Sequence, residues 1–167
     1  MTTTEGNIEL QELLKSISEY QSKIQFLEKK LDKFEAASQW ANDGLWDLDL
    51  ITNTPFISAP WKKMLGYEAD EFIELTGLWE KLLHPDDKRI ILKKFNNFIA
   101  GKSDMYNELF RLKHKKGSYK WIRSRAKNIK DKNGTVIRVS GSHTDVTEIV
   151  EAETAIRKSE EKYKLLF

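Results

Sequence analysis

The sequence of 167 residues contains no cysteine and no long run of apolar residues. The lack of thiols excludes disulfide bonds, thiolate metal sites and any photochemistry that forms a bond to cysteine. No apolar stretch approaches the roughly 20 residues that a membrane-spanning helix needs, and no signal peptide opens the chain. We therefore expect a cytoplasmic segment with no membrane span.

The sequence also lacks an excess of charge of either sign. Lysine and arginine contribute 28 residues and aspartate and glutamate 26, which leaves a net charge of +2 with the signs interspersed. The basic run Lys113–Lys120 is predicted to lie at a hairpin tip, where solvated lysines explain it better than nucleic-acid binding does. Hydrophobic residues make up 40% of the chain, enough for the packed core of one domain with extensions.

Signals of catalysis are missing as well. The three histidines, His84, His114 and His143, show no metal-ligand spacing and have no candidate nucleophile beside them. The glycines are isolated turn or strand glycines and form no phosphate-binding loop. The sequence therefore predicts no metal site and no enzymatic activity for this chain.

What the sequence does contain, in residues 1–35, is a heptad pattern. Apolar side chains recur at spacings of three and four residues, which is typical of a coiled coil. They are Leu10, Leu13, Ile17, Tyr20, Ile24, Leu27, Leu31 and Phe34. In a parallel homodimer Lys23 would face Glu28 of the second copy, and the next heptad repeats this attraction. The alternative is an amphipathic helix that folds back on its own domain.

Residues 36–147 carry the pattern of an α+β domain. Alternating, β-branched and aromatic segments predict strands at 45–50, 56–58, 105–114, 118–130 and 135–144, and Asn133-Gly134 predicts a tight hairpin turn. Short helices are expected at 60–65, 70–74 and 78–83, and a longer helix follows His84 and ends at Gly101. This order predicts an antiparallel sheet of five strands with the helices on one face.

A second helical segment, residues 148–167, follows the sheet. Asp145 can cap its first turn, with Glu148 three residues on in a capping-box arrangement. Apolar and small residues again follow heptad spacing, at Ile149, Ala152, Ile156, Ser159, Tyr163 and Leu166. The pattern runs to the last residue, so we expect the sequence to be a fragment of a longer protein.

Several of these segments resemble the PAS sensor domains of the PAS fold-3 type, the subgroup with a PAC-type C-terminal half. The matching pieces, in the family's order, are Gly44–Leu50, Met64–Tyr67, His84–Asp87, Gly117–Ile122, Asn133-Gly134 and Gly141–Thr147. The resemblance implies a PAS fold with flanking signalling helices. It also implies a sensory or dimerisation module of a signal-transduction protein, such as a two-component sensor histidine kinase or a diguanylate cyclase, with the output domain downstream.

A ligand pocket is expected between the sheet and the helices, because strand alternation points one set of side chains toward them. The candidate lining residues are Trp46, Leu48, Trp79, Glu108, Phe110, Ser124 and His143. Small residues at Ser124, Ala126 and Gly141 are expected to leave room above the sheet. By resemblance, His143 stands where flavin-binding relatives place a glutamine that contacts the ring.

Two polar residues of this set admit two interpretations. Glu108 lies among apolar neighbours, and a buried carboxylate needs a partner. In the first interpretation His143 is that partner, or a proton-linked sensor. In the second, a bulge turns Glu108 outward and His143 only hydrogen-bonds within the core.

Three functions stay open at this stage: a sensor of a small-molecule ligand, a ligand-free structural relay that works by dimerisation, and a redox sensor that binds flavin. The helix at 85–100 carries no histidine, which argues against haem. In each case we expect the signal to pass from the last strand through Asp145 and Thr147 into the C-terminal helix. The end of the strand and the helix cap are the same residues, so their geometry sets the exit angle of the helix.

Overall fold

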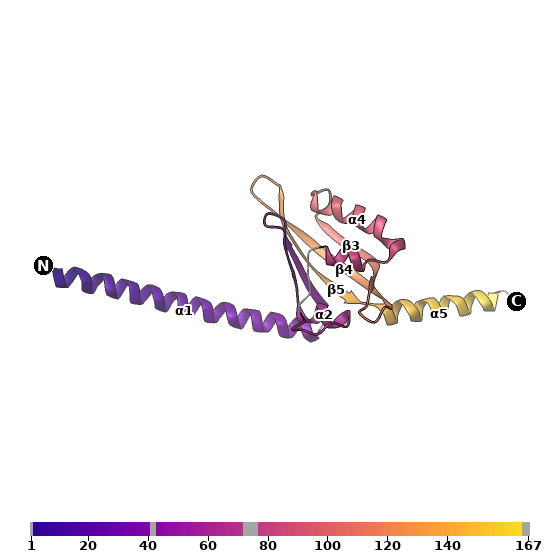
Figure 1. Ribbon diagram of the computed structural model, residues 1–167, viewed down its shortest axis with the longest axis horizontal. Helices are drawn as coiled ribbons and strands as arrows, with labels where there is room; N and C mark the ends of the chain where they lie inside the picture. Colours follow the sequence, from indigo (N-terminus) through magenta and orange to yellow (C-terminus); the bar gives the residue numbers. More distant parts are fainter. Residues whose placement is uncertain (1, 41–42, 72–76, 165–167) are drawn as a thin grey trace. The chain divides into compact units, whose positions relative to one another are not determined.

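The computed structural model describes residues 2–40, 43–71 and 77–164 (Figure 1). It confirms the expected α+β architecture: five strands form one antiparallel sheet in the order β2-β1-β5-β4-β3, with short helices packed on one face. Among the described residues, no helix combines the length and apolar character that crossing a membrane requires.

The secondary structure follows the predicted order. The strands are β1 (Asp43–Asp49), β2 (Thr54–Ile57), β3 (Met105–Lys113), β4 (Tyr119–Lys130) and β5 (Val136–Asp145). The helices are α1 (Thr2–Trp40), α2 (Ala59–Met64), α3 (Leu78–Leu82), α4 (Pro85–Ile99) and α5 (Thr147–Lys164). The helix expected at 70–74 falls largely on residues outside those described.

Helix α1 forms a unit of its own. It continues to Trp40, whereas the heptad pattern ended the coiled-coil helix at residue 35. Its described a and d side chains are 43–68% exposed: Leu10, Leu13, Ile17, Tyr20, Ile24 and Leu27. The predicted heptad residues Leu31 and Phe34 lie outside the side chains that the structure describes.

The turn between β1 and β2 contains no glycine, and an asparagine takes its place. Asn53 has a φ of +54°, a left-handed conformation that asparagine tolerates better than most residues. The carboxylate of Asp49 accepts hydrogen bonds from the backbone N–H groups of Ile51 and Thr52, each at 2.9 Å. The turn therefore closes early, and β2 begins at Thr54 instead of at the expected residue 56.

Two tryptophans lie directly against glycines of the sheet. A Cβ added to Gly44 would lie 2.6 Å from the Cα of Trp61 on α2, and one added to Gly141 would lie 2.9 Å from Cζ2 of Trp46. The missing side chains thus let α2 and the Trp46 ring approach the strands closely. The room that we expected Gly141 to leave for a pocket is taken by Trp46.

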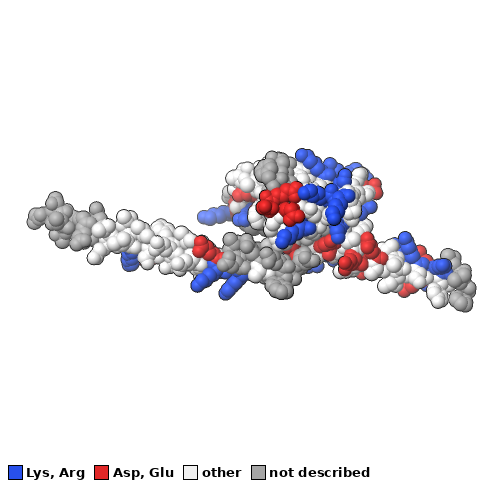
Figure 2. All heavy atoms as spheres, turned by 60° about the horizontal axis from the view of Figure 1, so that its bottom comes forward, with Lys and Arg blue, Asp and Glu red and all other residues white. Residues whose placement is uncertain are grey.

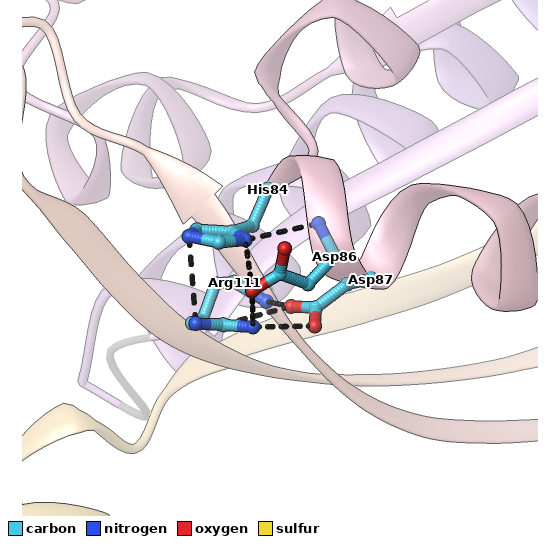
Figure 3. A network of polar contacts seen from close by, with 4 residues as sticks. All are labelled: His84, Asp86, Asp87 and Arg111. Carbon is cyan, nitrogen blue, oxygen red and sulfur yellow. Dashed lines mark hydrogen bonds and ion pairs between the residues drawn. The ribbon is translucent and has the colours of Figure 1, made fainter.

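A polar clamp of His84, Asp86, Asp87 and Arg111 fastens the start of α4 to β3 (Figure 3). The Arg111 guanidinium donates to the Asp87 carboxylate at 2.7 and 3.0 Å, and the Arg111 backbone N–H donates to it at 2.9 Å. His84 caps α4, its Nδ1 accepting from the Asp86 backbone N–H at 3.2 Å. The hydrogen bonds from Arg111 hold the pKa of the Asp87 carboxyl below its ordinary value.

The basic run Lys113–Lys120 lies around the turn between β3 and β4, as predicted. Two of its lysines have carboxylate partners: Lys115 pairs with Glu71 at 2.7 Å and Lys120 with Asp145 at 3.0 Å. Figure 2 shows the same mixture on the face that it presents, with basic and acidic side chains next to one another.

Candidate functional site

A cavity of about 460 Å³ lies between the inner face of the sheet and the helices. Its size falls within the range of about 300–1,000 Å³ that is usual for small-molecule sites. Aromatic and aliphatic side chains supply most of its lining, among them Trp46, Leu78, Trp79, Phe95 and Ile99. The cavity thus has the size and the mostly apolar character of a ligand pocket.

Five of the seven predicted pocket residues line this cavity: Trp46, Leu48, Trp79, Ser124 and His143. Phe110 is fully buried next to it, with its ring centroid 5.9 Å from that of Trp79 and 5.6 Å from that of His143. Phe110 therefore supports the wall from behind. The ligand-binding role of these residues stays a prediction.

Glu108 is not brought to His143, and it is not turned outward either. Strand β3 pairs with β4 in regular register, which keeps Glu108 on the same face as Tyr106 and Phe110. Its carboxylate accepts from the Lys94 ammonium on α4 at 2.6 Å. The sequence reasoning missed this partner because the lysine reaches over the sheet from a different element.

His143 is the polar centre of the buried site. It is 3% exposed, and its Nδ1 accepts a hydrogen bond from the indole N–H of Trp61 at 2.9 Å. Burial lowers its pKa from 6.5 to about 3, so the ring is neutral at physiological pH. Because Nδ1 is the acceptor, the single ring proton belongs on Nε2.

This geometry agrees with the interpretation of His143 as a hydrogen-bonding core residue. Sequence reasoning did not single out its partner Trp61, which lies on the helix α2 of six residues. A helix this short offers no periodicity from which its buried face could be read.

Within the described part of the chain, four polar atoms of cavity-lining residues are buried without a hydrogen-bond partner. They are Nε1 of Trp46, Nε1 of Trp79, the hydroxyl of Tyr106 and the hydroxyl of Ser124. All four residues line the cavity, and each such atom costs about 1–3 kcal/mol when it is left unpaired. Native proteins keep few such groups, so four around one cavity need an explanation.

The connection from β5 to α5 is held by a compact set of hydrogen bonds. Asp145 accepts from the backbone N–H of Thr147 at 2.9 Å and from its hydroxyl at 2.5 Å. The Thr147 hydroxyl oxygen also accepts from the backbone N–H of Trp121 on β4 at 2.9 Å. Asp145 and Thr147 therefore cap α5 and tie its first turn to the neighbouring strand.

The buried neutral ring of His143 predicts a specific pH dependence of stability. Its pKa is lower in the folded chain than in the unfolded chain, so the unfolded chain binds more protons between about pH 3 and 6.5. The free energy of unfolding should therefore fall by about 2 kcal/mol from pH 8 to pH 5, measured by urea unfolding at each pH.

The variant His143→Gln keeps a hydrogen-bond acceptor for Trp61 and should remove most of this loss. Above pH 5 the carboxylates contribute little, because their ordinary pKa values lie near 4. If the free energy of unfolding of the variant falls as much between pH 8 and pH 5 as that of the unaltered chain, His143 is not buried in its neutral form.

Residues 54–143 match the family described as PAS fold. Among solved structures, a sensory box histidine kinase/response regulator from Burkholderia thailandensis is similar with a TM-score of 0.68 and 30% identity, covering 79% of this chain and 98% of that one. The N-terminal domain of a diguanylate cyclase with a PAS/PAC sensor from Marinobacter aquaeolei shares the fold, with a TM-score of 0.54, 21% identity, and coverage of 63% and 95%.

Among curated proteins, the sensor protein FixL of Bradyrhizobium diazoefficiens is 30% identical over 117 residues, which are 70% of this chain and 23% of that protein. A blue-light-activated histidine kinase of Brucella anthropi is 25% identical over 126 residues, 75% of this chain and 25% of that protein. The chain thus spans about a quarter of the length of these relatives. It belongs to the PAS fold family and is a PAS domain related to those of sensor histidine kinases.

Proposed function

We propose that the chain is a cytoplasmic sensory and dimerisation module that binds a small molecule in its cavity and passes the resulting change into α5. The observation that carries this proposal is the cavity, whose lining residues contain four polar atoms that have no hydrogen-bond partner among the described residues. A ligand-free relay gains nothing from such atoms, because each one destabilises the folded chain. A bound molecule with matching polar groups would remove that cost.

The floor of the cavity and the cap of α5 belong to the same strand. His143 lines the cavity and precedes Asp145 by two residues on β5. In the sheet register His143 lies opposite Ser124, and Asp145 lies opposite Ile122. A ligand that shifts this part of β5 would therefore move the carboxylate on which the first turn of α5 depends.

The output of the signal would lie beyond the chain. The relatives FixL and the blue-light-activated histidine kinase are about four times longer than the matched segment, which supports a downstream histidine kinase as the partner. The diguanylate cyclase relative supports a cyclase as the alternative output. The chain itself would act as a regulatory domain and not as an enzyme.

Native mass spectrometry of the purified chain tests the sensor proposal. We expect a complex heavier than the 167-residue chain, and denaturation should release the extra mass as a small molecule. Leu48→Trp fills the cavity from β1 and should abolish the extra mass. The matched variant Leu45→Trp changes a leucine of the same strand that does not line the cavity, and should retain it. If neither the unaltered chain nor the Leu45→Trp variant carries a bound molecule, the result would favour the ligand-free relay.

The hydrogen bonds of Asp145 with Thr147 predict that ligand binding in the cavity and the response of the output domain can be separated. Asp145→Ala removes the acceptor of two hydrogen bonds from Thr147, so it should destabilise the start of α5 by about 0.5–2 kcal/mol. In the intact parent protein this variant should lose the ligand response of the output while the dissociation constant at the cavity stays the same. Hydrogen exchange in the first turn of α5 and an output assay measure the two effects.

A matched control exists at the other end of the sheet. Asp131 accepts from the backbone N–H groups of Asn133 and Thr135, each at 2.9 Å, in the turn before β5. Asp131→Ala removes a similar local cap away from α5 and should preserve the response. If the Asp145→Ala variant keeps its response to the ligand, the signal does not pass through Asp145 and Thr147.

The exposed heptad side chains of α1 support a parallel coiled-coil homodimer. Ile17 and Ile24 are 43% and 54% exposed and occupy successive a positions. Replacing both with aspartate would bury charges in the dimer seam, so size-exclusion chromatography with light scattering should change from dimer to monomer. Ser22→Asp changes the opposite face of the helix and should leave the dimer intact. If the unaltered chain, the double variant and Ser22→Asp all have the same mass in solution, Ile17 and Ile24 do not form the dimer interface.

A further inference from the structure

Strand β4 carries a row of positive charge on the outer face of the sheet, the face that points away from the helices. Alternate residues of β4 share this face, and the residues between them are buried. The row consists of Arg123, Arg125 and Lys127, which are all exposed. Their side chains have no hydrogen-bond or ion-pair partner among the described residues. Successive members stand about 7 Å apart along the strand, so they form one continuous basic row.

Strand β1 carries a row of the opposite sign on the same face. Its acidic members are Asp43, Asp47 and Asp49, with Leu45 at the remaining outer position. The Asp47 carboxylate accepts from the guanidinium of Arg138 on β5 at 2.8 Å, which offsets one of these charges. Strand β5 lies between β1 and β4. The outer face of the sheet therefore has an acidic half and a basic half.

The two edge strands place exposed apolar side chains on this face. Partners in the sheet register share a face, so Phe56 of β2 lies beside Asp47 and Met105 of β3 lies beside Lys127. Both apolar side chains are more than half exposed, and Leu109 of β3 is exposed as well. The charged rows are thus flanked by exposed apolar groups, which is a feature of surfaces that contact another protein.

The strand order makes this face complementary to itself. Strand β5 is the central strand, with β1 and β2 on one side and β4 and β3 on the other. When two copies pack face to face, a two-fold axis that runs along β5 places β1 of each copy over β4 of the other, and β2 over β3. An axis across the strands would instead place β1 over β1 and β4 over β4, where like charges repel each other.

The register of the sheet specifies which residues meet. Asp47 and Lys127 are both partners of Ser140 on β5, so the axis brings Asp47 of one copy over Lys127 of the other. Phe56 and Met105 continue the same row and meet in the same way. Face-to-face sheets lie about 10 Å apart, a distance that a lysine and an aspartate together can bridge.

We propose that a second copy of this chain packs on the outer face of the sheet, related to the first by a two-fold axis along β5. Asp47 of each copy pairs with Lys127 of the other. Asp43 pairs with Arg123 in the same way, because both are partners of Thr144. The strands of the two copies run in the same direction, so both chains enter their sheets at the same end, as a parallel coiled coil of α1 requires. This inference rests on the dimerisation proposed above and adds a contact that does not involve α1.

The size of the face predicts a contact that is weak by itself. Five strands about 4.8 Å apart and the seven residues of β1 give a face of roughly 24 by 24 Å. Two such faces bury about 1,150 Å², slightly less than most stable interfaces. The contact should therefore depend on α1, which keeps the two copies at a high local concentration.

Cross-linking through single cysteines tests the position of the axis, because the chain has no cysteine of its own. Ser142 lies on the outer face of β5, so two copies of the Ser142→Cys variant should face each other across the axis, and a short rigid bismaleimide should join them. Asn107→Cys is the matched control. Asn107 lies in the same row, next to Arg125, but on the edge strand β3, so its two copies should lie about 20 Å apart. We expect at least about tenfold more covalent dimer from Ser142→Cys than from Asn107→Cys.

Charge reversal tests the pairing of the rows. Lys127→Glu and Arg123→Glu each place a carboxylate over a carboxylate of the second copy, so each should slow the cross-linking of Ser142→Cys at least about threefold. Lys132→Glu changes the net charge by the same amount in the turn between β4 and β5, outside the strands, and should leave the rate unchanged.

Light scattering on the same samples separates this inference from the dimerisation on which it rests. Three results in a dimeric chain would overturn the contact between the sheets and leave the coiled coil standing: no cross-linking of Ser142→Cys, cross-linking no faster than that of Asn107→Cys, or an unchanged rate after both charge reversals. A chain that is monomeric and does not cross-link would overturn both.

Discussion

Close contact between two tryptophan side chains and two sheet glycines determines how near α2 can come to β1 and how closely the Trp46 ring lies over β5. Trp61 rests on Gly44 and Trp46 on Gly141, at distances that leave no space for a Cβ. From this position Trp61 also reaches His143 and supplies the single hydrogen bond that the buried imidazole accepts. The same contacts thus hold α2 on β1, fix the tautomer of His143 and shape one wall of the cavity.

The remaining polar networks are arranged around this core on different elements. The clamp of His84, Asp86, Asp87 and Arg111 holds α4 to β3, and the Arg111 guanidinium in turn lies 5.1 Å from the ring of Trp121 on β4. The backbone of Trp121 bonds to Thr147 at the start of α5. The helix that covers the sheet and the helix that leaves it are therefore both anchored, directly or through one neighbour, to β3 and β4. The polar groups of these networks have hydrogen-bond partners, whereas four polar atoms of the cavity-lining residues have none among the described residues. The free-energy cost of unpaired polar groups is therefore concentrated at the cavity, where a ligand could remove it.

Local signals in the sequence were sufficient for most of the fold. The alternation in β3 and β4, the turn at Asn133-Gly134 and the capping residues at His84 and Asp145 each act within a few residues, so they could be read without the structure. The sequence also predicted which face of each strand looks inward, and so four strand residues that line the cavity: Trp46, Leu48, Ser124 and His143. The partners of the polar residues could not be predicted in this way. Lys94 beside Glu108 and Trp61 beside His143 come from helices whose position over the sheet is a tertiary property.

The order of the strands has a consequence for how such a domain can be used. Strand β1 opens the sheet and β5 closes it, yet the two are neighbours, with Asp43 opposite Thr144. The chain therefore enters and leaves the sheet at nearly the same point. A domain whose two ends are adjacent can be inserted into a longer chain, duplicated in tandem or exchanged for another without pulling the flanking segments apart. The topology therefore allows the whole domain to be exchanged for another within a longer chain, and such an exchange can change the ligand specificity in one step.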